Sequence, residues 1–402
     1  MSLAIDRPVL VAGGGIGGLS AALALLKRGI PVRVFEQASE FRELGAGIQL
    51  GPNGTRLLFG LGLEDGLRAV SSEAAAKEIR LWNTGRTWKL FDLGEDSIAR
   101  FGAPYLMVSR ADLHRVLADA VRDIDPDALV LRARAAAAES HGDHAVLVLE
   151  DGRRIAGAAV IAADGVHSAL RRALAGEQAA TFTGMLAWRG AIPIEALPQD
   201  LQRPVGTNWV GPGGHVVTYP IRGGGVLNFV GIVERDDWRS ESWLDKGTTE
   251  ECAHDFRGWH PLVQTMIGAI DQPYKWALLV REPLERWVDG RVALLGDAAH
   301  ASLPFLAQGA IMAIEDAVML ARALEAHDND VPRALAAYQA TRRERANAVV
   351  RGSADNAKRF HNATLAEAGA AEAYIDKAWE PEAVRRRYDW LFEYDAATAP
   401  LA

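Results

Sequence analysis

The sequence has almost no cysteine, and this scarcity excludes several kinds of site. Cys252 carries the only thiol among 402 residues. A single thiol cannot build an internal disulfide framework, a CxxC redox pair or a thiolate zinc site. The ten histidines are scattered without the spacing of metal ligands, so the sequence predicts no metal site.

Long apolar runs and blocks of basic charge are absent too. The apolar run before Gly13 is short and ends in a glycine turn, so the sequence predicts neither a signal peptide nor a bilayer-spanning segment. The formal net charge is −8, which argues against a nucleic-acid surface. We therefore expect a cytoplasmic protein whose partners are small molecules rather than nucleic acid or a membrane.

The length and composition are those of a globular protein. A chain of 402 residues with 49% hydrophobic and 24% charged residues can bury a sizeable core. We expect two domains and an appendage.

A glycine-rich turn near the start is the strongest positive signal. A β-branched run at Val9–Ala12 leads into G-x-G-x-x-G, which is formed by Gly13, Gly15 and Gly18. An Ala/Leu-rich helical stretch and a second apolar run ending in Glu36 complete a βαβ unit. The glycines allow a tight turn and close approach of a pyrophosphate to the helix N-terminus. Glu36 is placed to accept hydrogen bonds from a ribose, so FAD or NAD is expected rather than NADP; a glycine turn of an unrelated α/β protein is the alternative.

A second strand-loop-helix signal spans residues 290–317, GRVALLGDAAHASLPFLAQGAIMAIEDA. An apolar run ends at Gly296 and Asp297, and a helix with apolar residues at helical spacing starts at Ala310. Asp297 can hydrogen-bond a polyol, and the N–H groups that open the helix can stabilise negative charge on a reduced flavin ring. The alternative is one more structural unit of the sheet.

Three weaker signals lie between these two. Asp164 and Gly165 follow a nearly continuous apolar run, at the strand end where open sheets meet ligands; a bare Asp-Gly often marks only a turn. Arg110 opens a predicted helix and can contact a phosphate or simply be solvated. The loop at 41–51, which contains Gln49, is expected to return across the cofactor, a plain surface loop being the alternative.

Residues 181–280 change to strands rich in Val, Tyr and Trp, separated by Gly/Pro turns. They predict an antiparallel sheet that forms a separate platform over the nucleotide fold. His215 begins an apolar strand and can act as a base near neutral pH, although a lone histidine is more often structural. Arg189 and Arg222 can pair with a substrate carboxylate or be structural. The tryptophans of this part are expected mainly in a core: Trp238, Trp243, Trp259 and Trp276.

The C-terminal part of the chain is predicted to be helical. Residues 331–351 and 354–371 predict two helices, the first capped near Asn329 or Asp330. The Arg- and aromatic-rich end, 382–394, is expected to pack against the main body or a second subunit, a frayed helical tail being the alternative.

Taken in order, these motifs resemble those of the flavin-dependent single-component aromatic hydroxylases. The matching segments are GGGIGG with Glu36, SRADL with Arg110, AADGVHSALRR with Asp164, and LLGDAAH, AQGA and IEDA in the segment of Asp297. Within that family the chain is most similar to the salicylate hydroxylase and 3-hydroxybenzoate 6-hydroxylase group, through GAGIQLGPN, VGPGGHVVTYPIRGG and RYDWLFEYD. The resemblance spans nearly the whole chain.

The resemblance implies an α/β fold with three parts. These are a glutathione-reductase-type Rossmann FAD-binding domain, an inserted and mostly antiparallel β-sheet substrate domain, and a C-terminal helical segment. The expected boundaries are residues 1–78, 105–180 and 281–350 for the FAD-binding domain, 79–104 and 181–280 for the substrate domain, and 351–402 for the helical segment.

The resemblance also implies an activity. An FAD-dependent monooxygenase would use NAD(P)H, as a transient electron donor, and O₂ to hydroxylate a phenolic aromatic acid of the salicylate or hydroxybenzoate type through a C4a-hydroperoxyflavin. The alternative is an FAD-binding ligand sensor, or an NAD(P)H oxidase uncoupled from hydroxylation. A homodimer is compatible with either.

The same resemblance assigns site residues. His215 resembles the histidine that activates the phenol, and the expected substrate pocket includes Tyr219, Pro304 and Phe305. Pro304 stands where 3-hydroxybenzoate 6-hydroxylases have Gln, and Phe305 stands where some salicylate and pyridine hydroxylases have His, which indicates a ring wall rather than a proton relay at that position. The expected cofactor-binding residues are Gly13, Gly15, Gly18, Glu36, Gln49, Arg110, Asp164, Gly165, Gly296, Asp297, Gln308, Gly309 and Ala310.

Overall fold

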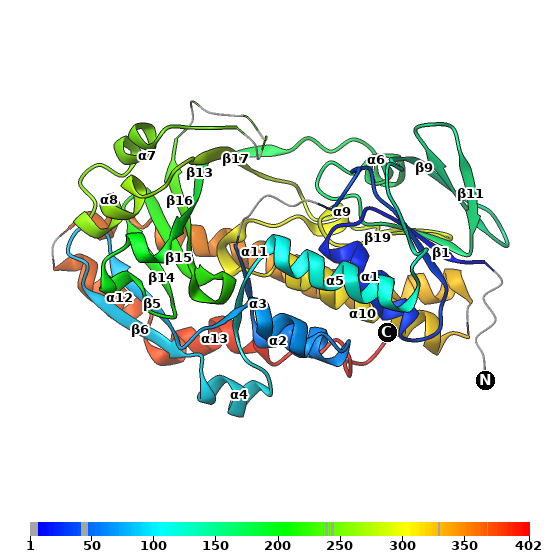
Figure 1. Cartoon of the computed structure of the whole chain (residues 1–402), viewed down its shortest axis with the longest axis horizontal. Coiled ribbons are helices and arrows are strands. Elements are labelled where there is room, and N and C mark those ends of the chain that lie inside the picture. Colours follow the sequence, from blue (N-terminus) through cyan, green and yellow to red (C-terminus); the bar gives the residue numbers. More distant parts are fainter. Residues whose placement is uncertain are drawn as a thin grey trace.

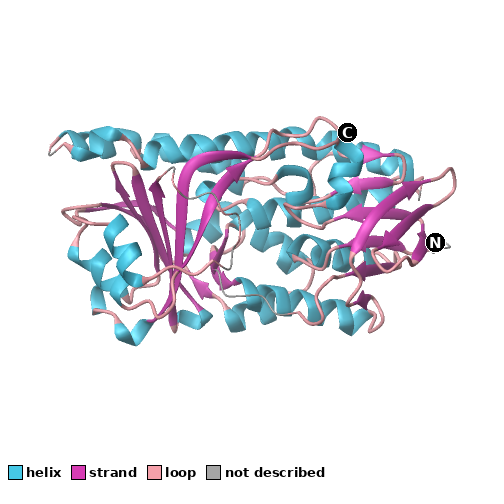
Figure 2. Cartoon of the chain, turned by 90° about the horizontal axis from the view of Figure 1, so that it is seen from above, coloured by secondary structure: helices cyan, strands magenta, loops and turns pink. Residues whose placement is uncertain are grey.

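The structure is a computed structural model that describes residues 7–41, 47–235, 237, 240, 242, 245–328, 330–367 and 369–402. The interpretations that concern residues 42–46, Trp238, Trp243 and a cap at Asn329 lie outside this part. Two large sheets lie toward opposite ends of an elongated molecule, and long helices run between and beside them (Figures 1 and 2).

A six-stranded sheet forms the end that holds the glycine turn. Its order is β18-β19-β12-β1-β2-β8, and all pairs are parallel except β18 with β19. The central strands are almost entirely buried because they are covered on both faces, which explains their continuous apolar runs. The strands are β1 (Val9–Ala12), β2 (Val32–Phe35), β8 (Leu129–Val130), β12 (Ala159–Ala162), β18 (Val288–Asp289) and β19 (Val292–Leu294).

Helices and a small sheet cover this parallel sheet. Helix α1 (Ile16–Leu26) packs against α5 (Arg110–Ile124) and α10 (Gly309–Ala326), and α10 packs against α11 (Val331–Phe360). The small sheet contacts β12 and β19 through β10 and β9. Its strands are β9 (Ala135–Ser140), β10 (Ala145–Leu149) and β11 (Arg154–Gly157).

A seven-stranded sheet forms the other end, in the order β17-β13-β16-β15-β14-β5-β6. All neighbours are antiparallel except β14 with β5, so the antiparallel sheet predicted for residues 181–280 is present and is extended by two earlier strands. The strands are β5 (Ala76–Leu81), β6 (Thr87–Asp92), β13 (Thr181–Pro193), β14 (Val205–Gly211), β15 (Gly214–Ile221), β16 (Val226–Glu234) and β17 (Tyr274–Val280).

The two faces of the seven-stranded sheet have different neighbours. One face places Trp188, Trp209 and Phe229 in a second apolar core with Trp259, beneath α7 (Thr249–Asp255) and α8 (Pro261–Gly268). Because side chains alternate along a strand, the residues between them point the other way. That second face is turned toward the six-stranded sheet.

The remaining elements join the two ends. A three-stranded sheet contains β3 (Gly47–Leu50), β7 (Leu106–Ser109) and β4 (Ser72–Glu73). The other helices are α2 (Pro52–Gly60), α3 (Glu64–Val70), α4 (Glu95–Phe101), α6 (Ala169–Ala175), α9 (Asp297–His300), α11 (Val331–Phe360), α12 (Ala370–Ala378) and α13 (Pro381–Phe392). Single 3₁₀ turns are η1 (Ile194–Ala196), η2 (Gln199–Leu201), η3 (Arg222–Gly224), η4 (Pro304–Leu306) and η5 (Ala363–Ala366). In the described part of the chain, no helix has the length and apolar character needed to cross a bilayer.

The prediction of two helices over 331–351 and 354–371 is wrong, because one helix, α11, runs through the expected break. Gly352 lies inside it, and a glycine within a helix costs only about 1 kcal/mol relative to alanine. Ser353 and Asn356 donate hydrogen bonds to the carbonyls of Leu303 and Phe305. These bonds anchor the helix at, and just beyond, the position where the sequence suggested an end.

The C-terminal helix α13 packs against the main body, on α2 and β6. The Phe392 ring contacts the rings of Phe91, Phe101 and Tyr105, with centroids 5.5–6.2 Å apart. The apolar end of the chain is therefore part of the core of this protomer.

A buried cluster of charges ties the helices to the parallel sheet. Arg342 lies 2.7 Å from Glu315 and 2.8 Å from Asp316, and all three side chains are fully buried. Arg345 pairs with Glu315 at 2.7 Å, and His300 lies 2.6 Å from Asp316. The carboxylates of α10 are thus held between two cations of α11 and a histidine of α9.

Charge pairing outweighs burial in this cluster. Burial raises the pKa of Asp316, but the charges of His300 and Arg342 outweigh this effect and lower the pKa to about 2. The unfolded chain has an aspartate pKa of about 3.9. A carboxylate whose pKa is lower in the folded state stabilises that state fully above pH 4 or so, and this contribution is lost as the pH falls through about 2.

Replacing Arg342 by Met should destabilise the fold strongly, because it leaves two buried carboxylates without their shared cation. Removing one partner of a buried ion pair costs about 3–5 kcal/mol. The matched control is Arg343→Met, one residue further along the same helix, where the side chain is 41% exposed and the expected change is within about 0.5 kcal/mol. Urea unfolding followed by circular dichroism measures both, and equal losses in the two variants would contradict the role given to the cluster.

Candidate active site

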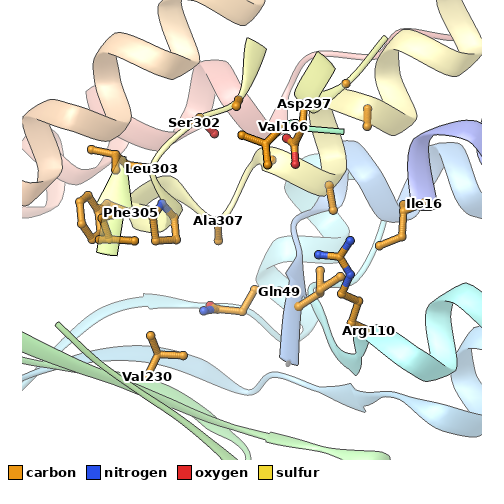
Figure 3. A pocket seen from close by; sticks show the side chains of 18 of the residues that line it. Ile16, Gln49, Arg110, Val166, Val230, Asp297, Ser302, Leu303, Phe305 and Ala307 are labelled. Atoms are coloured by element: carbon orange, nitrogen blue, oxygen red, sulfur yellow. The ribbon is translucent and has the colours of Figure 1, made fainter. Parts of the chain in front are cut away.

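A cavity of about 400 Å³ lies where the parallel sheet, the second face of the seven-stranded sheet and residues 301–310 meet. Its volume is in the range of pockets that hold small molecules and cofactors. Figure 3 shows Ile16, Arg110 and Asp297 toward one end and Leu303, Phe305 and Val230 toward the other, with Gln49 between them. We call these the nucleotide end and the ring end.

Glycine is found at each of the three positions of the first turn for a different structural reason. Gly13 has a φ of +103°, and a Cβ there would lie 2.3 Å from the carbonyl oxygen of Ala163. A Cβ on Gly18 would lie 2.0 Å from the carbonyl oxygen of Gly13. A Cβ on Gly15 would meet nothing within 4 Å. Gly13 and Gly18 are therefore required by the fold, whereas Gly15 keeps open a space at the start of α1, on the cavity wall.

Glu36 braces the glycine turn from the end of β2. Its Oε2 accepts a hydrogen bond from the backbone N–H of Gly14 at 2.7 Å, and its Oε1 accepts one from Ala38 at 2.8 Å. The half-buried carboxylate does not line the cavity but lies beside the turn that opens it. A negative charge is thus fixed next to the N-terminus of α1.

The second predicted loop also contributes to the wall of the nucleotide end. Gly296, with a φ of +62°, and Asp297 line the cavity at the start of α9. Gly309 and Ala310 line it at the start of α10. Gln308 is buried outside the lining, where its Oε1 accepts a hydrogen bond from Asn53 at 3.0 Å. The predicted residues of this loop therefore meet the cavity, with Gln308 supporting them from behind.

The Asp164 side chain lies outside the cavity lining, unlike the neighbouring Gly165. Its carboxylate accepts hydrogen bonds from the Ser168 hydroxyl at 2.5 Å and from the backbone N–H of Ala169 at 2.9 Å. These contacts satisfy the first turn of α6, and Asp164 does not line the cavity, whereas Gly165 does. The cofactor role given to the Asp164 side chain stays a prediction.

Arg110 and Gln49 lie on the cavity wall. Arg110 is the first residue of α5, close to the start of α1. The Oε1 of Gln49 accepts hydrogen bonds from Lys77 at 3.2 Å and from the Tyr105 hydroxyl at 3.0 Å. Residues 42–46 of its loop are outside the described part, and the contact of Gln49 with the cofactor stays a prediction.

His215 lies at the ring end with the predicted pocket residues. It is 1% exposed, and its ring packs against Phe305 and Phe360 with centroids 5.2 and 5.0 Å away. Tyr219 and Pro304 also line this end. Burial, together with the nearby His361, lowers the pKa of His215 well below its usual value. The imidazole is therefore neutral at pH 7, and one of its ring nitrogens is free to accept a hydrogen bond.

Lys77 is a cavity residue that sequence reasoning missed. It is 8% exposed on β5, and burial lowers its pKa to about 8. None of the ion pairs among the described residues includes Lys77, and the recorded partners of this largely protonated ammonium are neutral: the Gln49 amide and the ring of Tyr105, whose centroid lies 5.9 Å from Nζ. The segment AKEIRL alternates charges on both faces of β5, and nothing in it distinguishes Lys77 from Arg80.

Asn208 is a further polar residue of the ring end, whereas Arg189 and Arg222 lie outside the cavity lining. Asn208 lines the cavity beside Lys77's strand, and its buried Oδ1 has no hydrogen-bond partner in the described part of the chain. Arg189 stacks on Tyr274 and Trp276, and Arg222 is exposed; neither lines the cavity. The lysine and arginine side chains that line the cavity in the described part of the chain are Lys77, Arg110 and Arg281. Among the described residues, no group of three or more His, Cys, Asp or Glu side chains is placed to hold a metal ion.

Comparisons with known proteins agree with this arrangement. A family model described as FAD binding domain matches residues 6–353. The chain is 38% identical over 396 residues to the 3-amino-4-hydroxybenzoate 2-monooxygenase PtnB3 of Streptomyces platensis, with 98% of each chain covered. It is 36% identical over 394 residues to the 3-hydroxybenzoate 6-hydroxylase of Polaromonas naphthalenivorans, with 97% of this chain and 96% of the other covered.

Solved structures give the same result. Klebsiella pneumoniae HpxO, complexed with FAD and uric acid, superposes with a TM-score of 0.80 at 30% identity, covering 94% of this chain and 96% of the other. A salicylate hydroxylase in a substrate complex superposes with a TM-score of 0.79 at 27% identity, covering 97% of each chain.

The fold and the glycine cradle, with these similarities, define an FAD-binding flavoprotein. More narrowly, the chain belongs to the FAD-dependent aromatic hydroxylases. It is a monooxygenase that uses FAD as its cofactor.

Replacing Gly15 by Ala should separate cofactor binding from folding. The added methyl meets no atom within 4 Å in the protein, so the unfolding midpoint of the apoprotein is expected to match the parent. If that space holds the FAD pyrophosphate, the methyl overpacks it, and a cost of about 1–3 kcal/mol should weaken FAD retention by about fivefold to a hundredfold. Absorbance of the flavin after gel filtration measures retention.

The matched variant is Gly18→Ala, whose methyl would lie 2.0 Å from the carbonyl oxygen of Gly13. It should lower the unfolding midpoint of the apoprotein. A Gly15→Ala protein that retains FAD as tightly as the parent would show that the open space is not the pyrophosphate cradle.

Proposed function

We propose that this monooxygenase hydroxylates a phenolic aromatic acid at the ring end of the cavity, with NAD(P)H as electron donor and O₂ as oxidant. The observation that carries the proposal is the pairing of Lys77 and His215 on one face of the seven-stranded sheet. They supply a cation for a carboxylate and a base for a phenol. The relatives named for hydroxybenzoates support this substrate class.

The residues of the nucleotide end fit FAD. The space kept by Gly15 at the start of α1 suits a pyrophosphate, because free N–H groups and the helix dipole favour negative charge there. We assign Glu36 to the adenosine ribose, Arg110 to the phosphates and Asp297 to the ribityl chain. The N–H groups of Gly309 and Ala310, at the start of α10, would stabilise charge on the flavin ring edge. When bound, FAD supplies the transfer of electrons from NAD(P)H and of oxygen to the ring.

The arrangement of the sheets supports a division into domains. We propose that residues 105–180 and 281–350 belong with the N-terminal unit to the glutathione-reductase-type FAD-binding domain, and that 181–280 forms the inserted substrate domain. The range 181–280 coincides with the start of β13 and the end of β17. Since β5 begins at Ala76, we place the first boundary before that strand rather than at residue 78.

His215 acts as the base in this proposal. A neutral imidazole in an apolar wall can take the proton of the phenol and so make the ring more electron-rich. Phe305 and Pro304 exclude water from the same wall, which protects the reacting centre from side reactions. Tyr219, whose pKa is raised by burial, stays a neutral hydroxyl that can orient the ring.

Lys77 binds the substrate carboxylate. A buried ammonium without an anionic partner is unfavourable, and a bound carboxylate would supply that partner. The unpaired Oδ1 of Asn208, on the neighbouring strand, can accept a hydrogen bond from a second substituent of the ring. The ring end thus selects a small aromatic acid that also carries a hydroxyl or amino group.

The activity is tested by adding salicylate, 3-hydroxybenzoate, 4-hydroxybenzoate and 6-hydroxynicotinate separately to the FAD-loaded protein. At least one is expected to accelerate NAD(P)H oxidation and O₂ uptake, and mass spectrometry should find a product that has gained one oxygen atom. Oxidation that yields only hydrogen peroxide, or binding without oxidation, would favour the uncoupled oxidase or the sensor.

Replacing Lys77 by Met should weaken binding of the carboxylate specifically. Loss of a charge-assisted hydrogen bond costs about 1.5–3 kcal/mol, so the KM for the accepted acid should rise by about tenfold to a hundredfold. The Kd of the corresponding phenol without a carboxylate should stay unchanged, as should all values for the control Lys89→Met, whose side chain is 56% exposed on β6. An unchanged KM for the acid in Lys77→Met would remove Lys77 from substrate binding.

A further inference from the structure

A row of three titratable side chains leads from the cavity to the protein surface. The Nδ1 of His215 lies 2.6 Å from the Nε2 of His361, and the Nδ1 of His361 lies 3.0 Å from the Oε1 of Glu234. The side chain of His361 is 2% exposed, whereas that of Glu234 is 57% exposed. The row therefore begins at the ring end of the cavity and ends in water.

The backbone holds these residues in place, although they come from distant parts of the sequence. His215 is the second residue of β15, Glu234 is the last residue of β16, and His361 follows the end of α11. The N–H of Glu234 donates to the carbonyl of Gly213 at 2.8 Å, and the N–H of Gly213 donates to the carbonyl of His361 at 3.3 Å. These bonds fix the spacing of all three side chains.

An ionised Glu234 sets the proton positions along the row. Its carboxylate can only accept, so the Nδ1 of His361 carries a proton and its Nε2 is free to accept. The Nδ1 of His215 then carries the proton that it donates to His361. This leaves the Nε2 of His215 unprotonated, which is the form that a base needs.

The surroundings of His215 and His361 favour neutral imidazoles. Burial lowers the pKa of His361, and its hydrogen bond with Glu234 opposes this effect. The rings of Phe305 and Phe360 pack on His215, and Phe305 also approaches His361. These rings surround the histidine pair with apolar contacts.

We propose that His361 and Glu234 form a proton exit for His215 and fix the tautomer in which it acts as a base; this proposal rests on the function proposed above. The phenol proton moves to the Nε2 of His215, and the Nδ1 proton of His215 moves to the Nε2 of His361. The Nδ1 proton of His361 moves to Glu234 and from there to water. The transfers run in reverse when the product oxygen is protonated, which restores both tautomers.

Glu234→Gln tests the route, because it keeps a hydrogen-bond acceptor but removes the charge that sets the tautomers. Each phenolic acid of the panel is mixed with the oxidised, FAD-loaded protein in weak buffer containing phenol red, and the proton released on binding is followed by stopped flow. We expect release at least tenfold slower in Glu234→Gln and His361→Gln than in the parent, with an unchanged Kd for the acid. Glu234→Asp, which restores a carboxylate, should recover most of the rate.

The control is Glu285→Gln, a replacement of a glutamate that is 88% exposed, and it should release the proton at the parent rate. His215→Ala should retain FAD but abolish the fast release. Parent-like release in both Glu234→Gln and His361→Gln would overturn the proposed exit.

A second measurement needs no substrate. Nitrogen chemical shifts of ¹⁵N-histidine in the FAD-loaded protein report which ring nitrogen carries the proton. In the parent, His215 and His361 should both be protonated at Nδ1, and Glu234→Gln should change this pattern in both residues. An unchanged pattern would overturn the proposed relay, whereas a changed pattern in a protein that hydroxylates no phenol would leave the relay standing and refute the proposed function.

Discussion

The buried charges of α10 and α11 are the interaction on which the site depends. The carboxylate of Asp316 binds Arg342 and also accepts the backbone N–H of Gly296 at 3.0 Å. Glu315 accepts a hydrogen bond from Asn53 at 2.9 Å, and the same amide group donates to Gln308. The cluster therefore fixes both loops of the nucleotide end at once. Such a cluster is costly to desolvate, and here it holds the loops that carry Asp297 and the start of α10.

The seven-stranded sheet supplies the other half of the site, because the side chains along each strand alternate between its two faces. One face is filled by tryptophans and packs on α7 and α8, so the opposite face is free to present functional groups. Three adjacent strands place Lys77, Asn208 and His215 on that face. The register of the sheet places Lys77 opposite Gly206 and His215 opposite Val210, so the base lies two strands away from the cation and four residues further along β14.

Sequence reasoning succeeded where the signal is local. The turn of Gly13 and Gly18 is dictated by steric contacts within one βαβ unit, and His215 is placed by the turn before its strand. Lys77 could not be found, because its inward direction depends on the pairing of β5 with β14, far away in the sequence. The partnership of His215 with His361 depends on where α11 ends, and the predicted break near residue 352 hid that end. The motif around Asp164 gave no sign that this carboxylate accepts hydrogen bonds from the first turn of α6.

The most direct test of the account is a crystal structure of the FAD-loaded protein with the phenolic acid that it oxidises. We expect the carboxylate to lie within about 3.2 Å of the Nζ of Lys77 and the phenol oxygen to lie within about 3.2 Å of the Nε2 of His215. A ligand bound in the ring end with its carboxylate turned away from Lys77, or with its hydroxyl out of reach of His215, would contradict it.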